Sequence, residues 1–126
     1  PTRRSSDLKD IYEIFQPLMC DLAQEEFWVL LLNQATKLID KIRISSGGID
    51  GTYADVRSIL REALMQRATQ IAVVHNHPSG NIQPSQPDRT LTEHIRKAAD
   101  TMNIRLIDHV IVCEDGFYSF ADEGLL

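Results

Sequence analysis

The stretch HNHPSGNIQPSQPD, residues 75–88, decides how this chain is organised. It follows the apolar run IAVV, which has the length and the β-branched content of a buried strand. Because side chains two residues apart on a strand point to the same side, His75 and His77 emerge together and Asn76 faces away. Proline disfavours helical angles in the residue before it, so Pro78 predicts that the strand continues through His77.

A loop of turn-forming residues leads from the histidines to a helical pattern whose first turn contains Asp88. Apolar residues recur at helical spacing between Leu91 and Met102. The amino end of this helix can face the end of the histidine strand, so the carboxylate can join both imidazoles on one ion. Two imidazoles and one carboxylate, with a fourth position for water, are typical of a catalytic zinc site. The spacing therefore predicts a metal site at His75, His77 and Asp88.

Helix capping is the alternative explanation for part of this pattern. Ser-x-x-Asp ahead of an apolar run can be an N-cap, in which Ser85 bonds first-turn amides and Asp88 favours the positive end of the helix dipole. A His-x-His pair by itself can also make ordinary polar contacts. The two halves together, joined by a loop that a cap does not require, favour the metal interpretation.

The spacing of these residues resembles a known signature. His-x-His, seven residues, Ser, two residues and Asp is similar to the motif of the JAMM (JAB/MPN) metallohydrolases. The longer stretch HNHPSG, together with IDHVIV and YSF further along the chain, resembles the RadC family. Its members are bacterial proteins of that fold that are named as DNA repair proteins. The resemblance covers the chain from about Gln24 to its last residue.

This resemblance implies the fold class and a division of the chain. The expected fold is α/β, with a mixed β-sheet flanked by helices in a JAB/MPN (cytidine-deaminase-like) sandwich. An N-terminal helical segment at residues 1–23 would precede a RadC-like JAB/MPN domain at residues 24–126, in a single compact domain overall. Periodicity independently predicts compatible elements. Besides those already described, they are a helix from residue 7, strands over 24–32 and 37–45, a helix over 55–66, and strands over 104–113 and 117–120.

Two local features qualify these elements. Pro17 should kink or split the first helix, because proline removes a donor and crowds the preceding turn. The glycines of residues 46–51 could form a phosphate cradle, but the stretch lacks the lysine and the spacing of a P-loop. We therefore expect an ordinary connection there.

The resemblance also implies a chemistry. One Zn²⁺ per chain would be held by His75, His77 and Asp88, and water activated by the metal would hydrolyse an amide, peptide or isopeptide bond. The expected partner is a peptide or protein substrate. The RadC name leaves a second possibility open, a non-catalytic or accessory module in DNA repair. A zinc deaminase is disfavoured because the chain has neither His-x-Glu nor Cys-x-x-Cys.

Glu25 and Ser85 are the expected catalytic residues. In JAMM proteins a glutamate moves the proton of the attacking water, and it lies at the start of the strand that corresponds here to residues 24–32. Glu25 matches this glutamate by its offset from the apolar run of that strand. Glu26 would point the opposite way and is the second choice. A solvated strand end is the structural explanation for either carboxylate. Ser85, one turn before Asp88, would donate to the oxyanion of the tetrahedral intermediate.

Asp108 and His109 form a further polar pair, within the predicted strand over 104–113. Adjacent strand residues face opposite sides, so the two cannot share an ion without a bulge, and structural hydrogen bonding is the preferred role. His94 falls on the helix that follows Asp88, and we expect it on the helix surface.

Composition narrows the class of protein. The 126 residues are 43% hydrophobic and 25% charged, as in soluble globular domains, without a membrane-length apolar run or a secretory signal pattern. Because the chain begins at Pro1, we expect a fragment of a longer protein. Cys20 and Cys113 are isolated, which favours a cytoplasmic location. The net charge of −5 and the scattered basic residues argue against direct nucleic-acid binding by this fragment.

Overall fold

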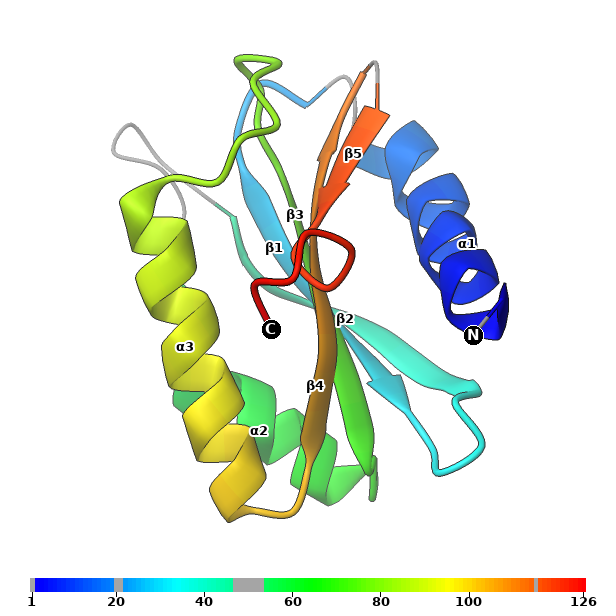
Figure 1. Ribbon diagram of the computed structural model, residues 1–126. Helices are drawn as coiled ribbons and strands as arrows, with labels where there is room; N and C mark the ends of the chain where they lie inside the picture. The colour runs from blue at the N-terminus through cyan, green and yellow to red at the C-terminus, as the bar shows by residue number, and fades with distance from the viewer. Residues whose placement is uncertain (1, 20–21, 47–53, 115) are drawn as a thin grey trace.

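The computed structural model describes residues 2–19, 22–46, 54–114 and 116–126, which form an α/β fold (Figure 1). Most of the predicted connection over residues 46–51, the first residue of the Asp115-Gly116 hairpin and Cys20 lie outside these residues. The elements, in order, are α1 (Thr2–Met19), β1 (Glu26–Leu32), β2 (Leu38–Ser46), α2 (Val56–Met65), β3 (Gln70–Asn76), α3 (Gln86–Thr101), β4 (Arg105–Cys113) and β5 (Gly116–Ser119).

The described strands form one mixed sheet in the order β2-β1-β3-β4-β5. β3 and β4 are parallel and connected through α3, whereas the other neighbouring pairs are antiparallel. α2 and α3 cover one face of the sheet and α1 covers the other (Figure 1). The predicted α/β class and the mixed sheet flanked by helices are confirmed.

Burial on both faces explains why the central strands are almost continuously apolar. In β1, Phe27, Val29 and Leu31 belong to the core beneath α2 and α3. Leu30 and Leu32 belong to the core beneath α1. The helix supplies Ile11, Phe15 and Met19 to that second core. α1 thus packs directly on the sheet, while the division of the chain at residue 24 stays a prediction.

One end of the sheet gathers the segments that the sequence singled out. β1 runs antiparallel to β3, so the start of β1 lies beside the end of β3, with Phe27 opposite His75. α3 begins at the same end, because the loop after β3 leads directly to it (Figure 1). Chain direction therefore brings the residues near 25, 75 and 88 together.

Two predicted details differ from the structure. α1 begins at Thr2 and is continuous through Pro17, so the helix is not split there, and a kink at Pro17 stays a prediction. Pro17 lies in the last turn, where its missing N–H removes a hydrogen bond close to where the helix ends anyway. β3 ends at Asn76 rather than His77. The N–H of His77 still donates to the carbonyl of Val112 at 3.2 Å, so the ladder reaches one bond beyond the strand.

No helix in the described part of the chain has both the length and the apolar character needed to cross a membrane.

Asp108 fastens β4 to the segment that follows β5. Its buried carboxylate accepts hydrogen bonds from the N–H of His109 at 2.7 Å, the hydroxyl of Ser119 at 2.7 Å and the N–H of Ala121 at 3.0 Å. Burial raises the pKa of Asp108 to about 6, more than these donors lower it. The folded chain therefore binds a proton at Asp108 more readily than the unfolded chain.

The Asp108 pKa predicts a pH dependence of stability. Between about pH 4 and pH 6 this carboxyl is ionised in the unfolded chain but still protonated in the folded chain, so stability falls as pH rises through this window, by about 3 kcal/mol in total. Asp108→Asn should lack this loss. Urea unfolding at pH 4 and pH 7 measures the difference between the two profiles. Asp100→Asn, which alters an exposed carboxyl on α3, should follow the wild-type profile. Parallel profiles for wild type and Asp108→Asn would contradict the assignment.

Candidate metal centre

Three polar side chains converge at the end of β3. The Nε2 atoms of His75 and His77 lie 3.0 Å apart. The Asp88 carboxylate places Oδ1 3.4 Å from Nε2 of His75 and Oδ2 3.2 Å from Nε2 of His77. Nitrogen and oxygen ligands at zinc-like bond lengths occupy tetrahedron corners about 3.3–3.6 Å apart. Each of these three contacts is thus close to the separation of neighbouring ligand atoms in such a shell, with a different Asp88 oxygen facing each histidine.

The loop after β3 orients His77. Gly80 has a positive φ of 85°, a conformation that costs glycine little, and its N–H donates to the carbonyl of His77 at 2.9 Å. This turn brings the carbonyl of Asn81 2.5 Å from Nδ1 of His77. Because a carbonyl only accepts, Nδ1 carries a proton, and the ring nitrogen of His77 that faces the cluster is Nε2.

Asp88 is held by the capping box at the start of α3. Ser85 is the N-cap, and its Oγ accepts from the N–H of Asp88 at 3.1 Å. Oδ2 of Asp88 accepts from the N–H of Ser85 at 2.9 Å. Burial disfavours the Asp88 carboxylate, but the adjacent imidazoles of His75 and His77 outweigh it and lower the pKa of Asp88. The capping alternative is therefore present and coexists with the convergence on the histidines.

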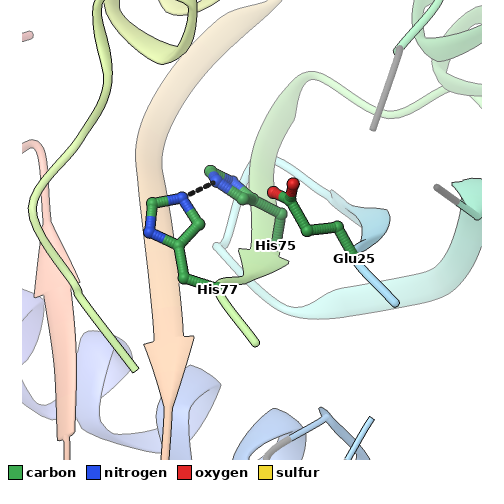
Figure 2. A group of neighbouring side chains, drawn as sticks. All are labelled: Glu25, His75 and His77. Atoms are coloured by element: carbon green, nitrogen blue, oxygen red, sulfur yellow. Dashed lines mark hydrogen bonds between the residues drawn. The ribbon is translucent and has the colours of Figure 1, made fainter. Parts of the chain in front are cut away.

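Glu25 lies immediately before β1, and its carboxylate points toward the imidazole of His75 (Figure 2). Glu25, His75 and His77 each offer a ligand atom within 4.8 Å of the other two. Glu26 makes different contacts, because Oε1 accepts from Nε1 of Trp28 at 3.0 Å and Oε2 lies 3.5 Å from Nη1 of Arg43. Of the two adjacent carboxylates, Glu25 is the one that joins the cluster.

Asn76, between the two histidines, was not assigned a role from the sequence. Its Oδ1 accepts from the N–H of Glu26 at 2.7 Å, and its Nδ2 donates to the carbonyl of Gln24 at 3.1 Å. Asn76 therefore holds the backbone on both sides of Glu25. A polar residue at a buried strand position was the available signal, but its partners are about fifty residues earlier in the chain.

His109 lies beside the cluster and is fully buried. Its Nε2 is 2.8 Å from Nδ1 of His75, and its Nδ1 is 2.5 Å from Oγ1 of Thr92. Burial and the neighbouring His75 lower the pKa of His109, so its imidazole is neutral. His109 thus makes hydrogen bonds, and one of its partners is His75, a residue of the candidate site. The sequence did not indicate that contact. Thr92 was not singled out at all, and His94 is exposed.

The cluster fits a divalent metal ion. His75 and His77 offer nitrogen ligands, and Asp88 and Glu25 offer carboxylate oxygens. Nδ1 of His77 is engaged by the carbonyl of Asn81, so Nε2 is the ring nitrogen left to bind a metal. Imidazole with carboxylate is a donor set that suits zinc and other borderline divalent metals. The Glu25, His75 and His77 group could therefore hold a metal ion, with Asp88 in contact with both histidines.

Known proteins resemble the whole chain. A family model described as the RadC-like JAB domain matches residues 5–125. A UPF0758 protein of Porphyromonas gingivalis is 48% identical over 128 residues, which cover 100% of this chain and 56% of that protein. A UPF0758 protein of Flavobacterium johnsoniae is 42% identical over 123 residues, 98% of this chain and 54% of the relative. A third, of Chlorobaculum parvum, is 36% identical over 124 residues, 98% of this chain and 56% of the relative. The chain spans about half the length of these relatives.

Metal content tests the centre directly. Wild-type protein incubated with Zn²⁺ and then freed of excess metal should retain about one ion per chain, measured by elemental analysis. His75→Ala and Asp88→Asn should each retain much less, because each removes one strong ligand. Asn at residue 88 keeps an acceptor for the Ser85 N–H, so the helix cap is preserved. His94→Ala alters an exposed histidine on α3 and should behave as wild type. Equal zinc in all four proteins would rule out the centre.

Proposed function

The chain belongs to the RadC-like JAB domain family, and from this premise we propose that it is a zinc-dependent hydrolase of the JAMM type. The proposed reaction is cleavage of an amide, peptide or isopeptide bond. The observation that carries this proposal is the convergence of two imidazoles and two carboxylates at the end of β3. Glu25 comes before β3 in the sequence, and Asp88 comes after it.

Each member of the cluster has a proposed part in this reaction. His75, His77 and Asp88 would hold the metal through two nitrogens and one oxygen. When bound, zinc supplies Lewis acidity and makes water nucleophilic near neutral pH. Glu25 would accept a proton from the water at its carboxylate and return it to the leaving nitrogen. The hydrogen bonds from Asn76 to the backbone around Glu25 would keep that carboxylate in position.

Ser85 would donate a hydrogen bond at the same site. Its Oγ accepts the capping hydrogen bond from Asp88, which uses a lone pair and leaves the hydroxyl proton free for another partner. Ser85 is exposed, so a substrate can reach it. A donor well aimed at a developing oxyanion lowers the activation free energy by about 3 kcal/mol.

Side-chain exposure indicates from which side a substrate would enter. His75 is 2% exposed, whereas His77 is 14% and Asp88 is 15% exposed. A scissile carbonyl would therefore approach over His77 and Asp88, close to the exposed Ser85. His75 would act from beneath, as a ligand shielded from the substrate.

Glu25→Gln tests catalysis separately from metal binding. Zinc-loaded wild-type protein should cleave members of a peptide and isopeptide library. Glu25→Gln should lower kcat by at least about 100-fold, because glutamine cannot accept the water proton. Its zinc content should stay within about twofold of wild type, since His75, His77 and Asp88 are unchanged and glutamine keeps an oxygen at residue 25. Cleavage products and bound metal are measured on the same samples by mass spectrometry and elemental analysis.

Glu26→Gln is the matched control, since it makes the same chemical change in a carboxylate that contacts Trp28 and Arg43 instead. It should retain most of the activity. Equal activity of Glu25→Gln and wild type would exclude Glu25 as the proton acceptor. A zinc-loaded wild type that cleaves no peptide or isopeptide, but binds DNA in a salt-dependent way, would favour the accessory role in DNA repair.

A further inference from the structure

A chain of short hydrogen bonds runs from the imidazole of His75 to the backbone of Asp88. Nδ1 of His75 is 2.8 Å from Nε2 of His109, and Nδ1 of His109 is 2.5 Å from Oγ1 of Thr92. The same Oγ1 is 2.7 Å from the carbonyl oxygen of Asp88, one helical turn earlier in α3. The chain begins at one proposed metal ligand and ends at the backbone of another.

The carbonyl of Asp88 fixes the direction of every proton in this chain. A carbonyl only accepts, so the hydroxyl of Thr92 must donate to it. Oγ1 of Thr92 has a single proton, so it accepts from Nδ1–H of His109. A neutral His109 with its proton on Nδ1 has a lone pair on Nε2, which accepts from Nδ1–H of His75.

The opposite direction would oppose two lone pairs. If the hydroxyl of Thr92 donated to His109 instead, no proton would separate Oγ1 of Thr92 from the carbonyl oxygen of Asp88 at 2.7 Å. His109 would then donate from Nε2, and a neutral His75 would carry its proton on Nε2, where it could not bind a metal. The contacts of Thr92 thus favour the proton arrangement that keeps the lone pair of His75 on Nε2, the nitrogen that faces His77 and Asp88.

Burial protects this arrangement from water. His75, Thr92 and His109 are 2%, 3% and 0% exposed, respectively. The ring of Phe120 stacks on His109 at 4.6 Å, and the ring of Phe27 stacks on His75 at 5.7 Å between centroids. Solvent therefore has little opportunity to exchange partners with these nitrogens, so the protein groups set their protonation pattern.

We propose that Thr92 and His109 are positioning residues that hold His75 in the Nδ1–H tautomer, so that its Nε2 lone pair faces His77 and Asp88 as a metal ligand. The proposal rests on the metal site described above. It adds that the site is prepared before the metal arrives: His109 prepares His75 from within the core, as the carbonyl of Asn81 prepares His77 from the loop. Thr92 is the residue that gives the chain its direction.

The tautomers can be measured in metal-free protein. The protein is labelled with ¹⁵N at its histidine rings, and NMR correlations are recorded at pH 8 between the ring nitrogens and the carbon-bound ring protons. They should show His75 and His109 both protonated on Nδ1. Nε2 protonation of neutral His75 as the main form would overturn the proposal, whatever the variants do. This measurement needs no bound metal, so it separates failure of the tautomer assignment from failure of the proposed metal site.

Thr92→Val and Thr92→Ser test the part played by the hydroxyl. Valine has nearly the shape of threonine but cannot relay the hydrogen bond, so His75 should populate both tautomers. The zinc dissociation constant, measured by competition with a chelator, should rise about 10-fold or more. Serine keeps the hydroxyl and should restore the wild-type tautomer and bring affinity within about twofold of wild type.

Thr101→Val is the matched control, because Oγ1 of Thr101 makes the same one-turn hydrogen bond in α3, to the carbonyl of Lys97 at 3.1 Å, on an exposed surface. It should keep the wild-type tautomers and zinc affinity. If Thr92→Val lowered thermal stability but left tautomer and zinc affinity at wild-type values, Thr92 would be a structural residue only and the proposal would fall. Wild-type protein with the expected tautomers but no zinc affinity would instead remove the metal site.

Discussion

The hydrogen bond between Nδ1 of His75 and Nε2 of His109 is the interaction on which the site depends. It joins β3 to its parallel neighbour β4 and lies in a core where an unpaired ring nitrogen would cost about 1–3 kcal/mol. Nδ1 of His109 is buried in the same core and is paired with Oγ1 of Thr92 in α3. Two strands and a helix are thereby connected through hydrogen bonds between buried side chains. The requirement that buried polar groups be paired therefore also fixes which atom of His75 faces the cluster.

Structural and chemical roles are combined in single residues at this end of the sheet. Oδ2 of Asp88 closes a capping box with Ser85 and also contacts His77, while Oδ1 contacts His75. Asn76 uses the opposite face of β3 to fasten the backbone around Glu25. A substitution at either residue will therefore change stability as well as the site. Conservative replacements such as Asp88→Asn are needed to separate the two effects.

Asp108 and His109 show how adjacent strand residues can serve different purposes. Asp108 binds Ser119 and the backbone of Ala121, which anchors the end of the chain beside β4. His109 contacts His75 and Thr92 instead. Within this polar pair, Asp108 therefore stabilises the fold and His109 lies next to the site. The two side chains have different hydrogen-bond partners, as expected of adjacent strand residues that face opposite sides.

Local pattern determined much of this protein. Alternation on a strand placed His75 and His77 together, helix-start chemistry placed Ser85 and Asp88, and the mixed α/β fold followed from the element order. These features depend on residues close in sequence, and motif resemblance identified the family. The catalytic and metal-binding roles of the site residues stay predictions. Only the tertiary structure brought Glu25 beside the histidines, Asn76 to the backbone around Glu25, and His109 and Thr92 to His75. Those contacts join segments far apart in the chain, so strand order and register decide them, and local periodicity carries no information about either.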